Sequence, residues 1–456
     1  MAIQTINPFD NSVVKKYTEY TDEAVDQKIA TAHEAYKIWK DTPVADRAKL
    51  LAKISELLLQ NKKKYAQLIT LEMGKLIGES EDEIDISAAI FKYYADNAEK
   101  FLEDKPFEVE EGKAYVRYTS IGVILGVEPW NYPFYQVARV ASPNVAVGNV
   151  IMVKHASNVP QCAQAIEDLF IEAGAAEGIY TNLFISSKKI DKLAQDNRIK
   201  GLALTGSEEA GASLAESAGK NLKKSVLELG GSDPFIVLDD ADIDNAVEQA
   251  FNGRMKNMGQ SCTAAKRLIV ADAIADEFLE KFTKRMSGLK VGNPADETTE
   301  IGPLSSEDAV KKLAEQVKDS IAAGATAVLG GKRLERDGAF MEPTILTNLK
   351  PGMRAYHEEL FGPVASFYRV KDEDEAIKLA NDSEFGLGGA VFSKDIKRAE
   401  RVALQIETGM VFINQPTASS PELPFGGTKR SGYGRELSSL GIEEFVNKKL
   451  IRISGN

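Results

Sequence analysis

The stretch Leu204-Thr205-Gly206-Ser207-Glu208-Glu209-Ala210-Gly211 joins the end of an apolar run to the start of a helical one through a glycine–serine turn. The residues before it, Gly201–Thr205, predict a buried strand, and Ser207–Lys220 predicts a helix. Strand and helix patterns alternate in this way from Ile121 onward. This rhythm is typical of a doubly wound parallel sheet, so the stretch decides the fold class as α/β.

The alternation forms two series, one on each side of residue 262. In the first we expect further strands at Gly122–Gly126, Val150–Lys154, Thr181–Ile185 and Ser225–Leu229, with a helix at Pro160–Ala173. In the second we expect strands at Arg267–Val270, Ala327–Leu329, Ala365–Val370, Ala390–Phe392 and Met410–Ile413. Its helices are expected at Ala273–Gly288, Glu307–Ala323, Asp374–Asn381 and Ile396–Ile406. Two α/β lobes with the functional residues at their junction are the simplest arrangement.

The first hundred residues are predicted to be mainly helical after a short extended arm over residues 1–20. Thr21 is followed by two acidic residues and is expected to cap the first helix. A second helix is expected from about Ala45, with Leu58 facing inward, and another over Glu79–Leu102.

A predicted β-hairpin separates this helical region from the first α/β series. Phe107-Glu108-Val109 and Ala114–Tyr118 flank a turn at Glu111-Gly112-Lys113, and a late strand, Lys449–Ile453, closes the chain. Such peripheral strands either pair between subunits or extend a sheet of their own chain. Both interpretations stay open from the pattern alone.

Composition sets limits on the function. The chain has 456 residues, a net charge of -12 and 43% hydrophobic residues, as expected for a globular protein of two or more domains. The acidic balance argues against nucleic acid or an anionic membrane as a partner. No signal peptide or membrane span is predicted, two cysteines cannot form a disulfide framework, and the three histidines predict no metal site. We therefore expect a cytoplasmic protein.

Cys262, in Gly259-Gln260-Ser261-Cys262-Thr263, is the candidate nucleophile, although a lone cysteine is more often a core residue. A thiol with an ordinary pKa needs a base or a positive field to react at neutral pH. No histidine lies near it in sequence, whereas Glu228, in Glu228-Leu229-Gly230-Gly231, is a candidate base. Gly259 and Gln260 are expected to form a strand-to-loop turn that presents the thiol.

A dinucleotide site is predicted where the parallel strands end. Gly206 and Ser207 start a helix whose free N–H groups suit a pyrophosphate, although such a turn is often only structural. Lys154 ends a strand and Ser157 follows it. The next strand runs into Ser186-Ser187-Lys188-Lys189, with no acidic residue to hold a ribose 2′-hydroxyl. This set favours NADP over NAD.

Seven motifs occur in order along nearly the whole chain. They are Glu128-Pro129-Trp130-Asn131-Tyr132-Pro133, Val153-Lys154-His155-Ala156-Ser157, Leu204-Thr205-Gly206-Ser207, Leu227-Glu228-Leu229-Gly230-Gly231, Gly259-Gln260-Ser261-Cys262, Glu358-Glu359-Leu360-Phe361-Gly362-Pro363 and Pro424-Phe425-Gly426-Gly427-Thr428-Lys429-Arg430-Ser431-Gly432. Together they resemble the aldehyde dehydrogenase superfamily. One motif alone is a weak signal, but seven in order are specific.

The resemblance implies a role for each motif. Cys262 attacks an aldehyde, the Asn131 amide and the Cys262 N–H stabilise the oxyanion, and Glu228 activates the water that hydrolyses a thioester after hydride transfer. Relatives that pass the acyl group to coenzyme A use no base at the position of Glu228, so a free acid is the expected product. The residues that this resemblance assigns to the cofactor are Trp130, Lys154, Ser157, Gly206, Ser207, Glu359 and Phe361.

The resemblance also divides the chain into domains. It implies a cofactor-binding domain over 1–105 and 122–230, to which 431–443 returns, a catalytic domain over 231–430, and an oligomerisation arm from 106–121 and 444–456. A homodimer or homotetramer is expected.

Arg139 suggests the substrate. It lies eight residues after Asn131, on one face of an expected helix, where succinate-semialdehyde dehydrogenases carry a carboxylate-binding arginine. Ser419 or Ser420 resembles the serine that assists it. A second arginine common in that group is replaced here by Lys256. Its ammonium is a point charge that cannot form the two parallel hydrogen bonds of a guanidinium.

Succinate semialdehyde, oxidised to succinate, is therefore the favoured substrate. A broader range of short-chain aldehydes stays open, as does, more distantly, a thiol hydrolase that needs no cofactor. A non-catalytic protein of the same fold would be expected to lack Cys262 or Glu228, and this chain has both.

Overall fold

The computed structural model describes residues 3–455, so residues 1, 2 and 456 of the predicted first and last segments lie outside the described part. Its first lobe contains a six-stranded sheet in the order β19-β9-β8-β5-β6-β7. The bounds are β5 Val123–Glu128, β6 Val150–His155, β7 Tyr180–Asn182, β8 Ile199–Thr205, β9 Lys224–Glu228 and β19 Gly432–Tyr433. All neighbours pair in parallel except β19, which runs antiparallel to β9. The carboxyl ends of β5, β6, β8 and β9 therefore meet at one edge.

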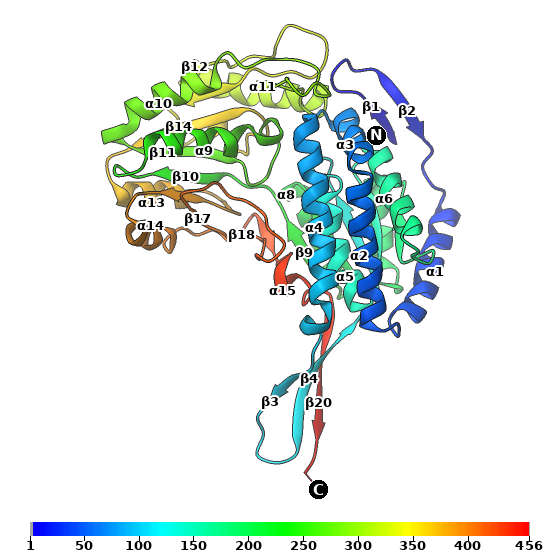
Figure 1. Ribbon diagram of the computed structural model, residues 1–456. Helices are drawn as coiled ribbons and strands as arrows, with labels where there is room; N and C mark the ends of the chain where they lie inside the picture. Colours follow the sequence, from blue (N-terminus) through cyan, green and yellow to red (C-terminus); the bar gives the residue numbers. More distant parts are fainter. Residues whose placement is uncertain (1–2, 456) are drawn as a thin grey trace.

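Helices cover this sheet, and a hairpin of β1 (Ile3–Ile6) with β2 (Val13–Tyr17) packs beside it (Figure 1). The helices are α1 Asp22–Trp39, α2 Val44–Gln60, α3 Lys62–Met73, α4 Ile77–Phe101, α5 Tyr135–Val147, α6 Pro160–Glu172, α7 Ile190–Gln195 and α8 Glu208–Lys220, with the 3-10 turn η1 at Ser187–Lys189. As predicted, the Thr21 hydroxyl caps α1 by accepting from the Ala24 N–H. Leu58 faces inward on α2, where α2 packs against α4.

The second lobe is built on a seven-stranded sheet in the order β12-β13-β14-β11-β10-β16-β17. Its strands are β10 Asp233–Val237, β11 Ala265–Ala271, β12 Thr326–Leu329, β13 Thr344–Thr347, β14 Val364–Val370, β16 Ala390–Phe392 and β17 Phe412–Ile413. Only β12 pairs antiparallel. The helices are α9 Ile243–Met255, α10 Asp272–Met286, α11 Glu307–Ala322, α12 Arg354–His357, α13 Glu373–Asn381 and α14 Ile396–Ala403. The two predicted α/β lobes are thus confirmed, and β15 (Phe385–Gly386) pairs with β18 (Thr428–Lys429) in a separate ribbon.

A three-stranded arm projects away from both lobes, with the C-terminus at its tip (Figure 1). It consists of β3 Lys105–Phe107, β4 Lys113–Ser120 and β20 Val446–Ile453. β20 runs antiparallel to β4 from Val446, opposite Ser120, to Ile453, opposite Lys113. The predicted hairpin and late strand therefore pair with each other within one chain, and α15 (Ser438–Gly441) leads into the arm.

Several elements escaped prediction. Helix α3 opens with three lysines, which hide its inward row of Tyr65, Ile69 and Met73, spaced four residues apart. Strands β10 and β13 and helix α9 were also not predicted. Strand β7 ends at Asn182 and β3 at Phe107, so the predicted continuations to Ile185 and Val109 were wrong.

No helix within residues 3–455 is long and apolar enough to cross a membrane. The same residues contain no group of His, Cys, Asp and Glu side chains that could hold a metal ion.

Adjacent leucines on α2 test the packing between α2 and α4. Leu58 is 1% exposed, whereas Leu59 is 52% exposed. We expect Leu58→Ala to cost about 2–5 kcal/mol of unfolding free energy, because the change leaves a cavity. Leu59→Ala should cost less than about 0.5 kcal/mol. Denaturant unfolding followed by circular dichroism measures both, and equal losses would contradict this packing.

Candidate active site

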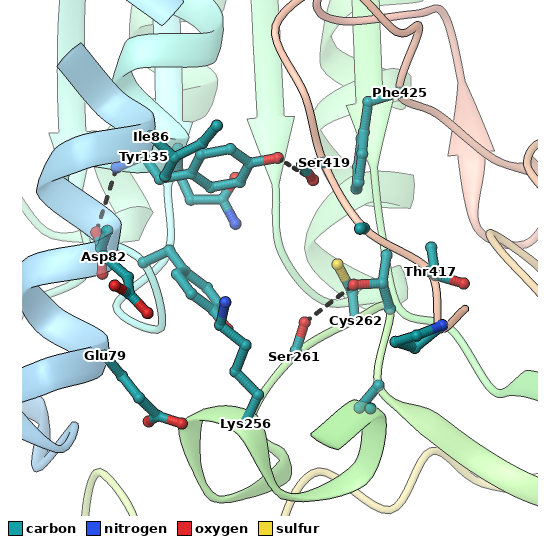
Figure 2. A pocket seen from close by; sticks show the side chains of 18 of the residues that line it. Glu79, Asp82, Ile86, Tyr135, Lys256, Ser261, Cys262, Thr417, Ser419 and Phe425 are labelled. Atoms are coloured by element: carbon teal, nitrogen blue, oxygen red, sulfur yellow. Dashed lines mark hydrogen bonds between the residues drawn. The ribbon is translucent and has the colours of Figure 1, made fainter. Parts of the chain in front are cut away.

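A cavity of about 370 Å³ lies between the two lobes and contains the candidate nucleophile. Figure 2 shows Cys262 and Ser261 on one side of it and helix α4, with Glu79 and Asp82, on the other. The remaining wall comes from α5, from the end of α9 and from residues 416–419 and 425. The residues that line the whole cavity include Ile86, Tyr132, Tyr135, Gln136, Arg139, Asn252, Lys256, Thr417, Ser419 and Phe425.

Cys262 is presented by a strained turn. Helix α9 ends at Met255, and the 3-10 turn η2 (Lys256–Gly259) has three consecutive left-handed residues, Asn257, Met258 and Gly259, with φ of 53°, 52° and 71°. A Cβ on Gly259 would lie 2.3 Å from the carbonyl oxygen of Gly362, so only glycine fits there. Cys262 then lies in a loop before β11. The predicted strand-to-loop turn at Gly259 and Gln260 was therefore wrong, because helix α9 precedes it.

Asn131 lies beside this loop, just after β5. Its Nδ2 donates to the Gln260 carbonyl oxygen at 3.1 Å, and its own carbonyl oxygen accepts from Asn257 Nδ2 at 3.0 Å. An amide nitrogen carries two hydrogens, so one remains for a ligand. The structure therefore joins Asn131 to the Cys262 loop, and the bond from Nδ2 orients its side-chain amide.

Glu228, the last residue of β9, is 2% exposed, and neither of its carboxylate oxygens has a hydrogen-bond partner among residues 3–455. Burial raises its pKa well above the usual range, as does the nearby Glu436, while Arg139 acts in the opposite direction. The residues that line the cavity do not include Glu228 or Asn131. Glu228 can act as a general base only in its ionised form, which burial disfavours and the charge of Arg139 favours.

The Cys262 thiol is protonated at neutral pH in this state. Burial raises its pKa to about 12, an effect that Arg139 and Lys266 partly offset. Lys266, 2% exposed, donates to the Ser261 and Cys262 carbonyl oxygens, each at 2.8 Å. Attack on a carbonyl carbon thus requires removal of the thiol proton.

Arg139 lines the cavity from α5, but its guanidinium is already engaged. It is 1% exposed and forms an ion pair with Glu436 through Nε. Nη1 donates to the Tyr135 hydroxyl at 3.3 Å, and the guanidinium lies 4.2 Å from the Phe425 ring centroid. Burial lowers the pKa of Arg139, but Glu436, Tyr135 and Glu228 together more than offset burial and keep this pKa above its usual value.

The other predicted substrate residues divide into two groups. Lys256 is exposed and lines the cavity, and Ser419 forms a 2.7 Å hydrogen bond with the Tyr135 hydroxyl on its wall (Figure 2). Ser420 does not line the cavity, and its Oγ is buried. Of the two candidate serines, the structure therefore brings only Ser419 to the pocket.

The predicted cofactor residues gather at the carboxyl edge of the first sheet. The Gly206 N–H donates to the Glu228 carbonyl oxygen at 3.0 Å, and the Ser207 hydroxyl caps α8 by accepting from the Ala210 N–H at 3.3 Å. Lys154 and Ser157 lie at the end of β6. Within residues 3–455 no carboxylate pairs with Lys154, and burial lowers its pKa.

Trp130 and Phe361 meet edge to face, with ring centroids 5.7 Å apart. Glu359, two residues before Phe361, accepts from the Gly231 N–H at 3.1 Å and pairs with Lys266 at 3.1 Å. Lys266 thus connects Glu359 to the Cys262 loop.

Lys189, in the segment after β7, is engaged by acidic residues. Lys189 pairs with Asp22 at 2.9 Å and lies 3.8 Å from Glu19, so its charge is already compensated by the α1 end of the lobe. The lysines after β7 were expected to attract a 2′-phosphate, but Lys189 is not free to do so. Lys154 is the better candidate.

Lys266, Glu436 and Tyr135 belong to the site but were not predicted from the sequence. Tyr135 carried a usable signal, since it precedes Arg139 by four residues and so shares its helix face. Glu436 had none, because it approaches Arg139 from a distant segment, and Lys266, only four residues after Cys262, belongs to no motif that marks it.

Comparison with known proteins agrees with this geometry. The model of the "Aldehyde dehydrogenase family" matches residues 1–451. The chain belongs to the aldehyde dehydrogenase family. Among relatives of this family member, the succinate-semialdehyde dehydrogenase [NADP(+)] of Deinococcus radiodurans is 52% identical over 448 residues, 98% of this chain and 94% of the relative.

Two further similarities cover the whole chain. A probable succinate-semialdehyde dehydrogenase [NADP(+)] of Synechocystis is 46% identical over 100% of both chains. The crystal structure of succinic semialdehyde dehydrogenase from Streptococcus pyogenes, in complex with NADP+, is 47% identical with a TM-score of 0.98, also over 100% of both chains.

The raised pKa of the Cys262 thiol predicts that the rate of its alkylation depends on pH. In cofactor-free protein, alkylation of Cys262 by iodoacetamide should be slow at pH 7 and rise about tenfold per pH unit beyond pH 9, because the thiolate fraction rises with pH up to the pKa. Alkylation is followed by mass spectrometry of the intact protein. Cys262→Ser gives the background, since Cys162 is fully buried. A rate that levels off near neutral pH would refute the raised pKa.

Proposed function

We propose that this chain oxidises succinate semialdehyde to succinate with NADP, through a thioester on Cys262 that water hydrolyses. The family membership and the names of its relatives support this assignment. The observation that carries it is the single cavity that holds Cys262 together with two cationic side chains, Arg139 and Lys256. An aldehyde with a carboxylate at its far end would pair with these two cations, although acidic Glu79, Asp82 and Glu83 line the same cavity.

Recognition of the carboxylate would use four side chains. Arg139 Nη1 and the hydroxyls of Tyr135 and Ser419 form a connected chain on the cavity wall, so the positive field of a buried guanidinium reaches the pocket. Lys256 supplies a second charge at the exposed side. Hydrogen bonds to a charged group are worth about 1.5–3 kcal/mol each, enough to favour a carboxylate over a methyl group.

The chemistry assigned to the chain's own residues follows. The Cys262 thiol first gives its proton to the Glu228 carboxylate, which releases it to solvent. Sγ then bonds to the aldehyde carbon as the C=O π bond breaks, and the Asn131 amide donates to the oxygen that becomes negative. The nicotinamide cofactor, when bound, accepts the hydride that leaves this carbon. Glu228 then removes a proton from a water molecule, which attacks the thioester and releases the acid and the thiol.

The cofactor preference rests on Lys154 and Ser157. A partly buried ammonium with no carboxylate partner in the described part of the chain, next to a serine hydroxyl, fits a 2′-phosphate. An acidic residue, which would hold a ribose 2′-hydroxyl and repel a phosphate, does not follow β6. The relatives named as NADP(+) enzymes and the Streptococcus pyogenes complex support the same choice.

A broader oxidation of short-chain aldehydes is the second candidate. The ion pair of Arg139 with Glu436 favours it, because a guanidinium that is already neutralised binds a substrate carboxylate less strongly. The substrate comparison below separates the two.

Assembly into a homodimer or homotetramer through the arm, and location in the cytoplasm, belong to the same proposal. The exposed apolar side chains of the arm, Phe107, Leu450 and Ile453, support the first. Light scattering of the purified protein tests it.

Substrate recognition is tested with Arg139→Lys and Lys256→Met. Arg139→Lys retains the positive charge beside Glu436, so the fold is preserved. It loses the planar guanidinium, which can form two parallel hydrogen bonds to a carboxylate. Each change should lower kcat/KM for succinate semialdehyde by about tenfold or more and leave that for uncharged butanal within about threefold. Initial rates of NADPH formation measure this. Equal losses with both aldehydes would reject the carboxylate role.

The role of Glu228 is tested with Glu228→Gln. This isosteric amide cannot take a proton from water, so deacylation should slow by about 100-fold or more. One equivalent of NADPH should then form rapidly before a slow steady state, as seen by stopped-flow absorbance. A full steady-state rate in the variant would exclude Glu228 as the base.

The cofactor choice is tested with Ser157→Glu and Lys154→Met. The new carboxylate should repel a 2′-phosphate and lower kcat/KM with NADP at least about 30-fold, while NAD turnover falls less or rises. Lys154→Met should weaken NADP binding more than NAD binding. Equal changes with the two cofactors would contradict a 2′-phosphate site here.

A further inference from the structure

Two carboxylates one turn apart on α4, those of Glu79 and Glu83, accept hydrogen bonds from backbone N–H groups. These backbone segments lie near Cys262 and Asn131, the two residues expected to stabilise the oxyanion. Glu79 accepts from the Asn257 N–H with Oε1 at 3.1 Å and Oε2 at 3.0 Å. Glu83 Oε1 accepts from the Phe134 N–H at 2.8 Å and from the Tyr135 N–H at 3.2 Å. Glu79 therefore binds the second lobe, and Glu83 binds the start of α5 in the first.

The Glu83 end is rigid. Its side chain is fully buried and forms an ion pair with Lys75, which is also fully buried. Lys75 Nζ lies 3.5 Å from the centroid of the Tyr132 ring. A carboxylate at the N-terminus of α5 satisfies free N–H groups and complements the helix dipole. Residues 132–135, which follow Asn131 directly, are thus held against α4.

The Glu79 end holds a segment that is strained by itself. Asn257 and Met258 adopt left-handed backbone conformations, which cost non-glycine residues of the order of 1 kcal/mol or more each. Such strain persists only where surrounding contacts impose it. Within residues 3–455, the Asn257 N–H donates only to Glu79.

From Asn257 the contacts continue to the reacting groups. Its Nδ2 donates to the carbonyl oxygens of Asn131 at 3.0 Å and of Gln260 at 3.1 Å. The same Gln260 oxygen accepts from Asn131 Nδ2 at 3.1 Å, and Cys262 is two residues further along. A continuous path of hydrogen bonds therefore joins Glu79 to Asn131 and to the Cys262 loop.

We propose that Glu79 is a positioning residue that, through Asn257, sets the placement of Cys262 relative to the Asn131 amide. The inference rests on the proposed function, because it assigns a purpose to the same two groups. It differs from a substrate-binding role, which the place of Glu79 on the cavity wall also allows (Figure 2). Misplacement of reacting groups by about 1 Å can cost on the order of 100-fold in rate.

Glu79→Ala removes the acceptor, and Glu79→Gln keeps one acceptor oxygen in nearly the same shape. Glu81→Gln is the matched control: Glu81 lies on the same helix, and its ion pair with Lys62, at 3.7 Å, is on the surface. Glu79 itself is half-buried and has no ion pair in the described part of the chain, so both variants should fold. Thermal unfolding confirms this before kinetics.

Two measurements follow. The first is the alkylation rate constant of Cys262 with iodoacetamide, without cofactor or aldehyde. The second is single-turnover NADPH formation, with KM for succinate semialdehyde. We expect Glu79→Ala to lower both rate constants by about tenfold or more while KM stays within about threefold. Glu79→Gln should recover a large part of the loss, and Glu81→Gln should match the wild type.

A rise in KM with unchanged rate constants would overturn the proposal and make Glu79 a substrate contact. Unchanged values throughout, or an equal loss in Glu81→Gln, would also overturn it. If Glu79→Ala does not fold, Glu79→Gln decides by the same criteria with a smaller expected loss. The alkylation experiment needs no aldehyde, so it tests Glu79 even if the wild type oxidises none and the proposed function fails.

Discussion

The structure depends on a backbone turn that is unfavourable on its own. Three consecutive left-handed residues, 257–259, bring Cys262 to the junction of the lobes. Buried Arg254 donates through Nη2 to the carbonyl oxygens of Gly259 and Gly362, each at 2.7 Å, and so ties the turn to the second lobe. Glu79 and Asn131 bind it from the first lobe. The nucleophile is therefore placed by contacts from both lobes.

Charge in a dry interior is the second constraint on the site. Glu228, Glu436 and Arg139 are all buried, with Arg139 lining the cavity, and one guanidinium cannot neutralise two carboxylates. Arg139 pairs with Glu436, so Glu228 is left with a pKa well above its usual range because of burial. The same burial keeps the Cys262 thiol protonated. Both groups must therefore lose a proton before they can act, Cys262 as nucleophile and Glu228 as base.

Prediction from sequence succeeded where the signal is local. The strand ending at Thr205 and the helix capped by Ser207 follow from a periodic apolar pattern and a turn, and the structure has both. It failed for α3, whose first residues are lysines, and for α9, which precedes the nucleophile. Each of these helices has an incomplete apolar face. The sequence pattern alone therefore does not show that the helix is buried, and the elements packed against it decide this.

The sequence by itself determined the α/β class, the family and the identities of Cys262, Glu228 and Asn131 as candidates, because these depend on ordered motifs and residue chemistry. Only the tertiary structure decided that Arg139 is paired with Glu436, that Ser419 and not Ser420 reaches the cavity, and that Lys189 is engaged by Asp22. It also joined Glu79 to Asn257 across 178 residues of chain. Such pairings arise between segments far apart in sequence, and no periodicity or spacing along the chain encodes them.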